Sequence, residues 1–190
     1  MRKQLLLLSL AVVALLWSGC GSTDLSLLNE VKRFEPEWMD LSEQVTDISR
    51  LLRKTETTYE EFVAFASPRV GSPEADEATE LSRALADYRG LIKERDALSE
   101  RFEETRKRFE EAVQAFNRWQ NALMRDELKA KKAQAEFERY QQTYAQLSEE
   151  MATLEHDLGD NVESANSLVR QICRGLNSLR EDEYLIDLTY

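Results

Sequence analysis

Residues 102–123 read FEETRKRFEEAVQAFNRWQNAL, and this stretch decides the class of fold. Its large apolar residues recur every seven positions, with a second set between them, as expected for an α-helix that buries one face. The same heptad frame extends in both directions, from Leu81 to Leu158. Between Leu91 and Leu158 the chain contains neither glycine nor proline. The pattern predicts an all-α protein made of long, coiled-coil-like helices.

Three helices are expected, over residues 25–66, 74–158 and 161–181. The segment SPRVGSP at 67–73 is a loop by composition, and Gly159 followed by the Asp160/Glu163 pair indicates a helix stop and a new start. A short loop makes the first two helices antiparallel. Centred near Val70, it pairs Tyr59 with Leu81, Leu52 with Tyr88 and Trp38 with Phe102.

The favoured architecture is an elongated antiparallel helical hairpin with a short third helix, occupying residues 25–182 and followed by a tail at 183–190. A compact three- or four-helix bundle is the alternative, and it requires the long helix to bend near Asn117–Asn121. If the 74–158 helix is continuous, its central part has no helix to pack against. The resulting apolar seam predicts an interface for an envelope protein or a second copy, formed by Phe116, Trp119, Leu123 and Leu128.

The first twenty residues contain a signal of a different kind. Arg2 and Lys3 precede an apolar run from Leu5 to Leu16, which is followed by Ser18, Gly19 and Cys20. This order predicts a signal peptide over 1–19, a lipidated Cys20 carrying diacylglycerol and an N-acyl chain, and a short linker over 20–24. The segment resembles the lipobox of bacterial lipoproteins. An uncleaved anchor and ordinary cleavage that leaves a free thiol are the alternatives.

This N-terminus implies a lipid bilayer as a partner and a location on the extracytoplasmic side of the membrane. The destination is the outer membrane where the host has one, because Gly21 is not the aspartate that retains such proteins at the inner membrane. The protein carries a formal charge of −11, and removal of 1–19 deletes two basic residues and makes it −13. This acidity argues against nucleic acid and anionic lipid as ligands.

A basic group interrupts the acidic surface and predicts either a solvated face or a contact with anionic cell-wall polymer. It consists of Arg118, Arg125, Lys129, Lys131 and Lys132. The chain otherwise offers little chemistry: His156 is the single histidine, and Cys173 lies at helical spacing among apolar residues. We therefore expect no catalytic residues, no metal site and no cofactor besides the lipid.

The chain also resembles the cell-wall-binding lipoproteins described in Gram-positive bacteria, through segments such as 91–98 (LIKERDAL) and 137–144 (FERYQQTY). Three functional hypotheses follow. The first is a non-enzymatic structural or scaffolding lipoprotein of the cell envelope, and the second is a wall-binding module. The third is an accessory subunit of an envelope complex, docked by a period-two tail strand containing Tyr184, Ile186, Leu188 and Tyr190. A tail that folds over the last helix, or is simply mobile, is the favoured interpretation, and the docking strand is the alternative to it.

Overall fold

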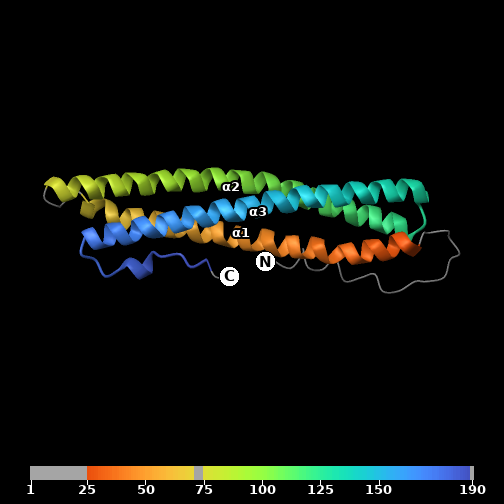
Figure 1. Ribbon diagram of the computed structural model, residues 1–190, viewed down its shortest axis with the longest axis horizontal. Coiled ribbons are helices and arrows are strands. Elements are labelled where there is room, and N and C mark those ends of the chain that lie inside the picture. Colours follow the sequence, from red (N-terminus) through yellow and green to blue (C-terminus); the bar gives the residue numbers. More distant parts are fainter. Residues whose placement is uncertain (1–24, 71–74, 189–190) are drawn as a thin grey trace.

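The computed structural model describes residues 25–70 and 75–188, which form three long helices and one short 3-10 turn (Figure 1). The elements are α1 (Leu25–Val70), α2 (Ala75–Met124), α3 (Ala130–Gly175) and η1 (Glu181–Glu183). The prediction of an all-α fold is confirmed. At about 1.5 Å per residue the 50-residue α2 is about 75 Å long, so the bundle is a slender rod.

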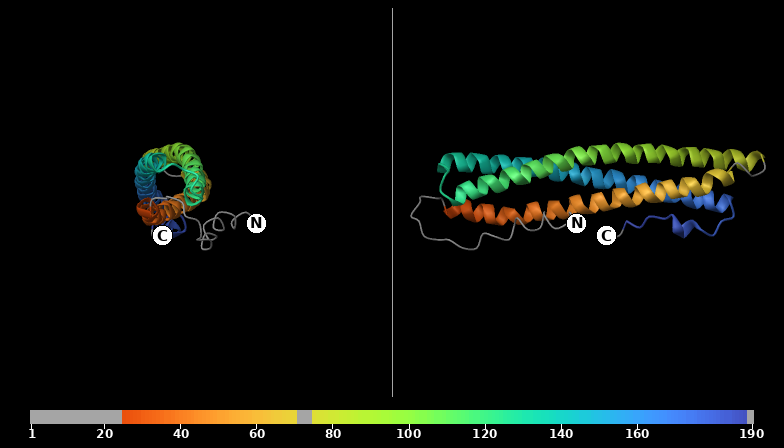
Figure 2. Two further views of the ribbon diagram at one scale, coloured as in Figure 1. Left: turned by 90° about the vertical axis from the view of Figure 1, so that its right-hand side faces the viewer. Right: turned by 180° about the vertical axis from the view of Figure 1, so that it is seen from behind.

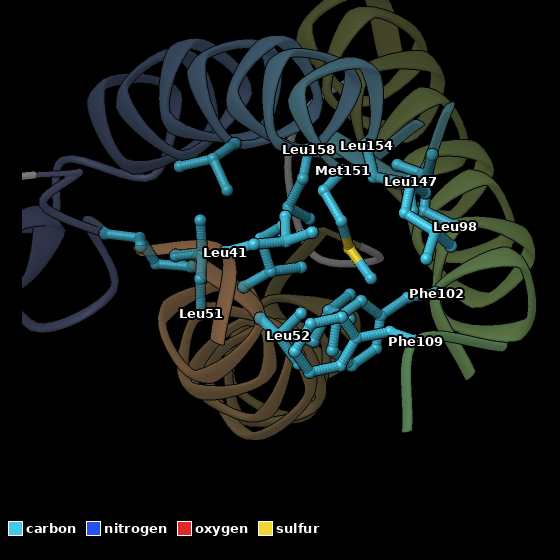
Figure 3. Close-up of a cluster of buried hydrophobic side chains, with 14 of the residues drawn as sticks. Leu41, Leu51, Leu52, Leu98, Phe102, Phe109, Leu147, Met151, Leu154 and Leu158 are labelled. Carbon is cyan, nitrogen blue, oxygen red and sulfur yellow. The ribbon is translucent and has the colours of Figure 1, made fainter. Parts of the chain in front are cut away.

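The helices run up, down and up around one axis, as the end-on view of Figure 2 shows. α1 and α2 are antiparallel, α2 and α3 are antiparallel, and α1 and α3 are therefore parallel. Every helix contributes leucine, phenylalanine or methionine side chains to the interior (Figure 3). Met151 and Leu158 of α3 and Phe102 of α2 are almost completely buried. α3 covers the apolar side chains that a hairpin of α1 and α2 alone would leave exposed to water.

The expected continuous helix over 74–158 is wrong, because the chain reverses at residues 125–129. Asp126 adopts a left-handed conformation with φ of 56°. Its amide donates to the carbonyl of Leu123 at 3.1 Å, and the amide of Glu127 donates to the carbonyl of Ala122 at 3.0 Å. These two bonds form a Schellman motif, which satisfies the last carbonyls of α2 and turns the chain. The compact alternative was therefore the better one, with its turn slightly beyond the expected Asn117–Asn121.

The predicted helix stop at Gly159 is also wrong. α3 passes through Gly159 and ends at Gly175, so the third helix has 46 residues rather than the short span expected. The end of α3 has the same hydrogen-bond pattern as the end of α2. Asn177 has φ of 49°, and the amide of Ser178 donates to the carbonyl of Cys173 at 2.8 Å. Aspartate and asparagine tolerate this conformation better than other non-glycine residues. After both helices, the left-handed position that glycine usually occupies is thus taken by a short polar residue, Asp126 or Asn177.

The pairing of α1 with α2 differs from the expectation by one heptad. Tyr59 packs on Tyr88 with ring centroids 5.4 Å apart, and Trp38 packs on Phe109 at 6.1 Å. α1 continues through Pro68 to Val70, four residues beyond its predicted end. The turn is therefore centred a few residues later than Val70. Each residue of shift in the centre moves the antiparallel register by two, which accounts for the seven-residue difference.

The three helical glycines offer a matched test of this packing. A methyl group added at Gly90 or Gly159 meets nothing within 4 Å, whereas at Gly175 it would lie 2.4 Å from Cδ2 of the buried Leu81. We expect Gly159→Ala to stabilise the protein by about 0.5–1 kcal/mol, because alanine loses less backbone entropy in a helix. Gly175→Ala should destabilise it by about 1–3 kcal/mol through overpacking.

Urea unfolding followed by circular dichroism measures both effects, with Gly90→Ala as the control for open space. Equal stabilisation by all three substitutions would contradict the close approach of α2 and α3 at this end of the rod.

Candidate interaction surfaces

The residues predicted to form an exposed seam lie instead inside the bundle. Phe116, Trp119 and Leu123 are only 3%, 5% and 3% exposed, and Leu128 is partly buried against the same core. The expectation of an apolar surface at this seam is therefore wrong. It rested on the continuous helix, and the reversal at 125–129 brings α3 back to cover these residues.

An aromatic cluster takes the place of the seam. The ring of Trp119 stacks on Phe137 of α3 with centroids 5.9 Å apart and planes 8° apart, and Phe116 stacks on Trp38 of α1 at 5.7 Å. Edge-to-face contacts extend the cluster across all three helices; its members are Phe34, Trp38, Phe109, Phe116, Trp119, Phe137, Tyr140 and Tyr144. Offset-stacked and edge-to-face pairs are the favourable arrangements of aromatic rings. This cluster joins the three helices close to the end of the rod where α1 begins.

A buried polar layer crosses the rod nearer the end where α1 and α3 finish, and heptad spacing alone did not indicate it. The hydroxyl of Tyr59 donates to Oδ1 of Asn161 at 2.8 Å, and Nδ2 of Asn161 donates to the carbonyl of Leu91 at 3.0 Å. Tyr88 lies against Tyr59, and the nearby Arg95 has a side chain only 7% exposed, paired with Asp96 at 2.9 Å. One hydrogen-bonded asparagine thereby links all three helices at a fixed register.

Burial in this layer should make the fold sensitive to alkali. Desolvation raises the pKa of both Tyr59 and Tyr88 well above the ordinary value near 10, although Arg95 opposes the effect at Tyr59. The folded state therefore keeps protons that the unfolded chain releases, so stability is full below pH 10 and declines as the pH rises above it. We expect the melting temperature to fall more steeply above pH 10 in the wild type than in Tyr88→Phe.

Absorbance at 295 nm, recorded together with circular dichroism, provides the check. Ionisation of all six tyrosines near pH 10 while the helices remain intact would contradict the burial of this pair.

Four of the five basic residues singled out in the sequence gather at one end of the rod. Arg125 lies in the α2–α3 turn, Lys129 precedes α3, and Lys131 and Lys132 lie in its first turn. All four are exposed, and so is Arg118, which lies nearly two turns back along α2. α1 begins at this same end of the rod (Figure 1). Cys20 itself is outside the described residues.

His156 and Cys173, the two residues with potentially reactive side chains singled out in the sequence, both lie on α3. His156 is 75% exposed on α3, with Nδ1 3.8 Å from a carboxylate oxygen of Asp160. Cys173 is fully buried, and this burial raises the pKa of its thiol. The expectation that Cys173 serves as a small apolar filler is confirmed.

The tail folds back along the bundle instead of presenting a strand. Asn166 of α3 holds the backbone of Ile186 at two points, accepting from its amide at 2.9 Å and donating to its carbonyl at 2.8 Å. Tyr184 packs on Phe62 and Phe65 of α1, with centroids 5.3 and 5.2 Å away. The favoured interpretation, a tail folded over the last helix, is thus confirmed. The alternative docking strand is wrong for Tyr184 and Ile186, which are buried in their own chain, while Tyr190 lies outside the described residues.

A shallow hollow beside the tail is a further surface feature of the rod. Two guanidinium groups lie over the ring of Phe65 there, Arg69 at 4.3 Å and Arg180 at 5.2 Å from its centroid. Arg180 also pairs with Glu183, which raises the pKa of the arginine and lowers that of the glutamate. The cation–π contact of Arg180 with Phe65 joins the tail to α1.

Comparison with known proteins yields no relationship: no family model matches the chain, and no curated protein or solved structure is significantly similar to it. Within residues 25–70 and 75–188, no helix has an apolar stretch long enough to cross a membrane. The same residues bring together no group of three or more side chains able to hold a metal ion.

Proposed function

We propose that this protein is a lipid-anchored, non-enzymatic structural protein of the bacterial cell envelope, in which a three-helix rod is tethered by one end to the membrane surface. One observation carries the proposal. The signal-like segment ends at Ser18-Gly19-Cys20, and the rod begins five residues later at Leu25. A lipid on Cys20 would thus be attached almost directly to the first turn of α1.

The length of the connection supports a short tether. A fully extended chain spans at most about 3.6 Å per residue, so the Cα of Leu25 can lie no farther than about 18 Å from that of Cys20. This distance is small beside the length of the rod, about 75 Å for α2. The anchored end would stay at the bilayer surface, and the other end could reach far beyond the headgroups.

The composition of the rod supports a scaffolding role. Its apolar side chains are used to join the three helices, and its flanks carry charged side chains paired along and between helices. Arg108 of α2 pairs with Glu150 of α3, and Arg101 pairs with Asp157 at 3.0 Å. Such a body keeps its shape as a spacer or platform between the membrane and whatever lies above it.

Metabolic labelling tests the anchor. In a bacterial host that processes lipoproteins, the full chain should incorporate labelled palmitate, partition with membranes and yield a mature N-terminus at Cys20. Cys20→Ser should abolish the label and release the protein from the membrane, because thioether formation needs the cysteine sulfur. An inhibitor of the lipoprotein signal peptidase should cause the uncut precursor to accumulate.

Cys173→Ser is the matched control, since this thiol is buried in the bundle and should leave labelling unchanged. A wild-type chain without label, cleaved at another position or retained whole, would overturn the proposed anchoring.

A further inference from the structure

The end of the rod that would carry the lipid is also its basic end. The aromatic contacts of Phe34 with Phe116 and Phe137, at 6.1 and 5.6 Å, place the start of α1 beside the end of α2 and the start of α3. The turn between α2 and α3 closes this end (Figure 1). Arg125, Lys129, Lys131 and Lys132 are therefore at the same end as the tether, all of them exposed.

This local charge is opposite to that of the protein as a whole. Residues 118–132 contain five basic and two acidic side chains, whereas the rest of residues 20–190 contains 18 basic and 34 acidic ones. The first nine residues of α1 add Glu30, Lys32 and Arg33. Net charge alone argued against anionic lipid, but at physiological salt the Debye length is only about 8 Å. A membrane at this end would thus be attracted by the basic end and would barely sense the acidic body.

The position of the lysines within α3 is a second, independent indication. Lys129 is the N-cap, with no side-chain capping bond, and the first turn of α3 contains no acidic residue. The N-terminus of a helix carries partial positive charge and favours acidic side chains. Three lysines at this position are unfavourable for the isolated rod. An anionic surface would remove that repulsion and could also accept hydrogen bonds from the exposed amides.

Two apolar side chains at the same end complete the surface. Leu25 is 60% exposed at the start of α1, and Met124 is 39% exposed at the end of α2. Basic side chains beside exposed apolar ones are typical of surfaces that rest on a bilayer.

We propose that the basic end formed by Arg125, Lys129, Lys131 and Lys132 binds the headgroups of anionic phospholipids. This contact orients the tethered rod, with its basic end on the bilayer and its acidic body directed away from it. The inference rests on the proposed function for its tether. The lipid on Cys20 would hold the chain at the membrane, and each lysine or arginine near an anionic surface adds about 1 kcal/mol of attraction.

Vesicle binding tests this surface without relying on cellular lipidation. In the mature chain (20–190), Cys20 can be coupled to a single maleimide-linked acyl chain, because the buried Cys173, with its raised pKa, should not react. Binding is then compared between phosphatidylcholine vesicles and vesicles that also contain phosphatidylglycerol. The wild type should bind the anionic vesicles about tenfold or more tightly, and the preference should fade as salt rises.

Replacement of the four basic residues by glutamine should abolish this preference while leaving binding to phosphatidylcholine unchanged. The matched control removes the same charge elsewhere, by Arg83→Gln, Lys107→Gln, Arg170→Gln and Arg174→Gln, all at exposed positions. This control should retain the preference. Circular dichroism of each variant verifies that the bundle is folded.

Three outcomes would overturn the inference, and none of them bears on whether cells lipidate Cys20. The first is equal binding to both vesicle types, and the second is equal loss in the control variant. The third is binding of the uncoupled chain to purified cell-wall sacculi that disappears in the glutamine variant, without any preference for anionic vesicles. That result would assign the basic end to wall polymer instead of the membrane.

Discussion

The chain reversal at residues 125–129 is the constraint on which the rest of the structure depends. Asp126 in the left-handed region allows two amide bonds to close the end of α2. Because α2 ends there, α3 returns along it, and Trp119 stacks on Phe137 while Phe116 meets Tyr140. The same reversal turns an unpartnered apolar seam into the interior of a bundle, and it limits α2 to 50 residues where an unbroken helix over 74–158 would continue to Leu158.

This arrangement gives the two ends of the rod different side chains and different charges. An up-down-up bundle places the start of α1, the end of α2 and the start of α3 at one end. The start of α1 and four basic side chains are brought together there, although about a hundred residues separate Leu25 from Arg125 in the sequence. The other end carries the α1–α2 connection and the tail, which Asn166 and the ring of Phe65 hold in place. The proposed membrane contact follows from this polarity, whereas the proposed anchoring rests on the sequence that ends at Cys20.

Heptad spacing was sufficient to predict an all-helical fold, because burial of one helical face depends on periodicity alone. It could not locate the turn, since Leu123 and Ala130 are seven residues apart and the heptad phase continues unbroken across it. Asp126 was the available signal, one of three polar residues in the frame. The other two, Arg95 and Thr105, are buried within the helical bundle. The basic residues were recognisable in the sequence, but their position beside the start of α1 depends on the tertiary fold.

The distance between residues 101 and 157 tests the chain reversal most directly. Arg101 and Asp157 form an ion pair at 3.0 Å, although they are 56 residues apart in the sequence. Spin labels at these two positions, in a chain without Cys20 and Cys173 and diluted with unlabelled protein, would report their separation by pulsed electron resonance. We predict a single short distance, as expected for side chains in contact. A distance near 84 Å, the span of 56 residues in one continuous helix, would contradict the folded-back bundle.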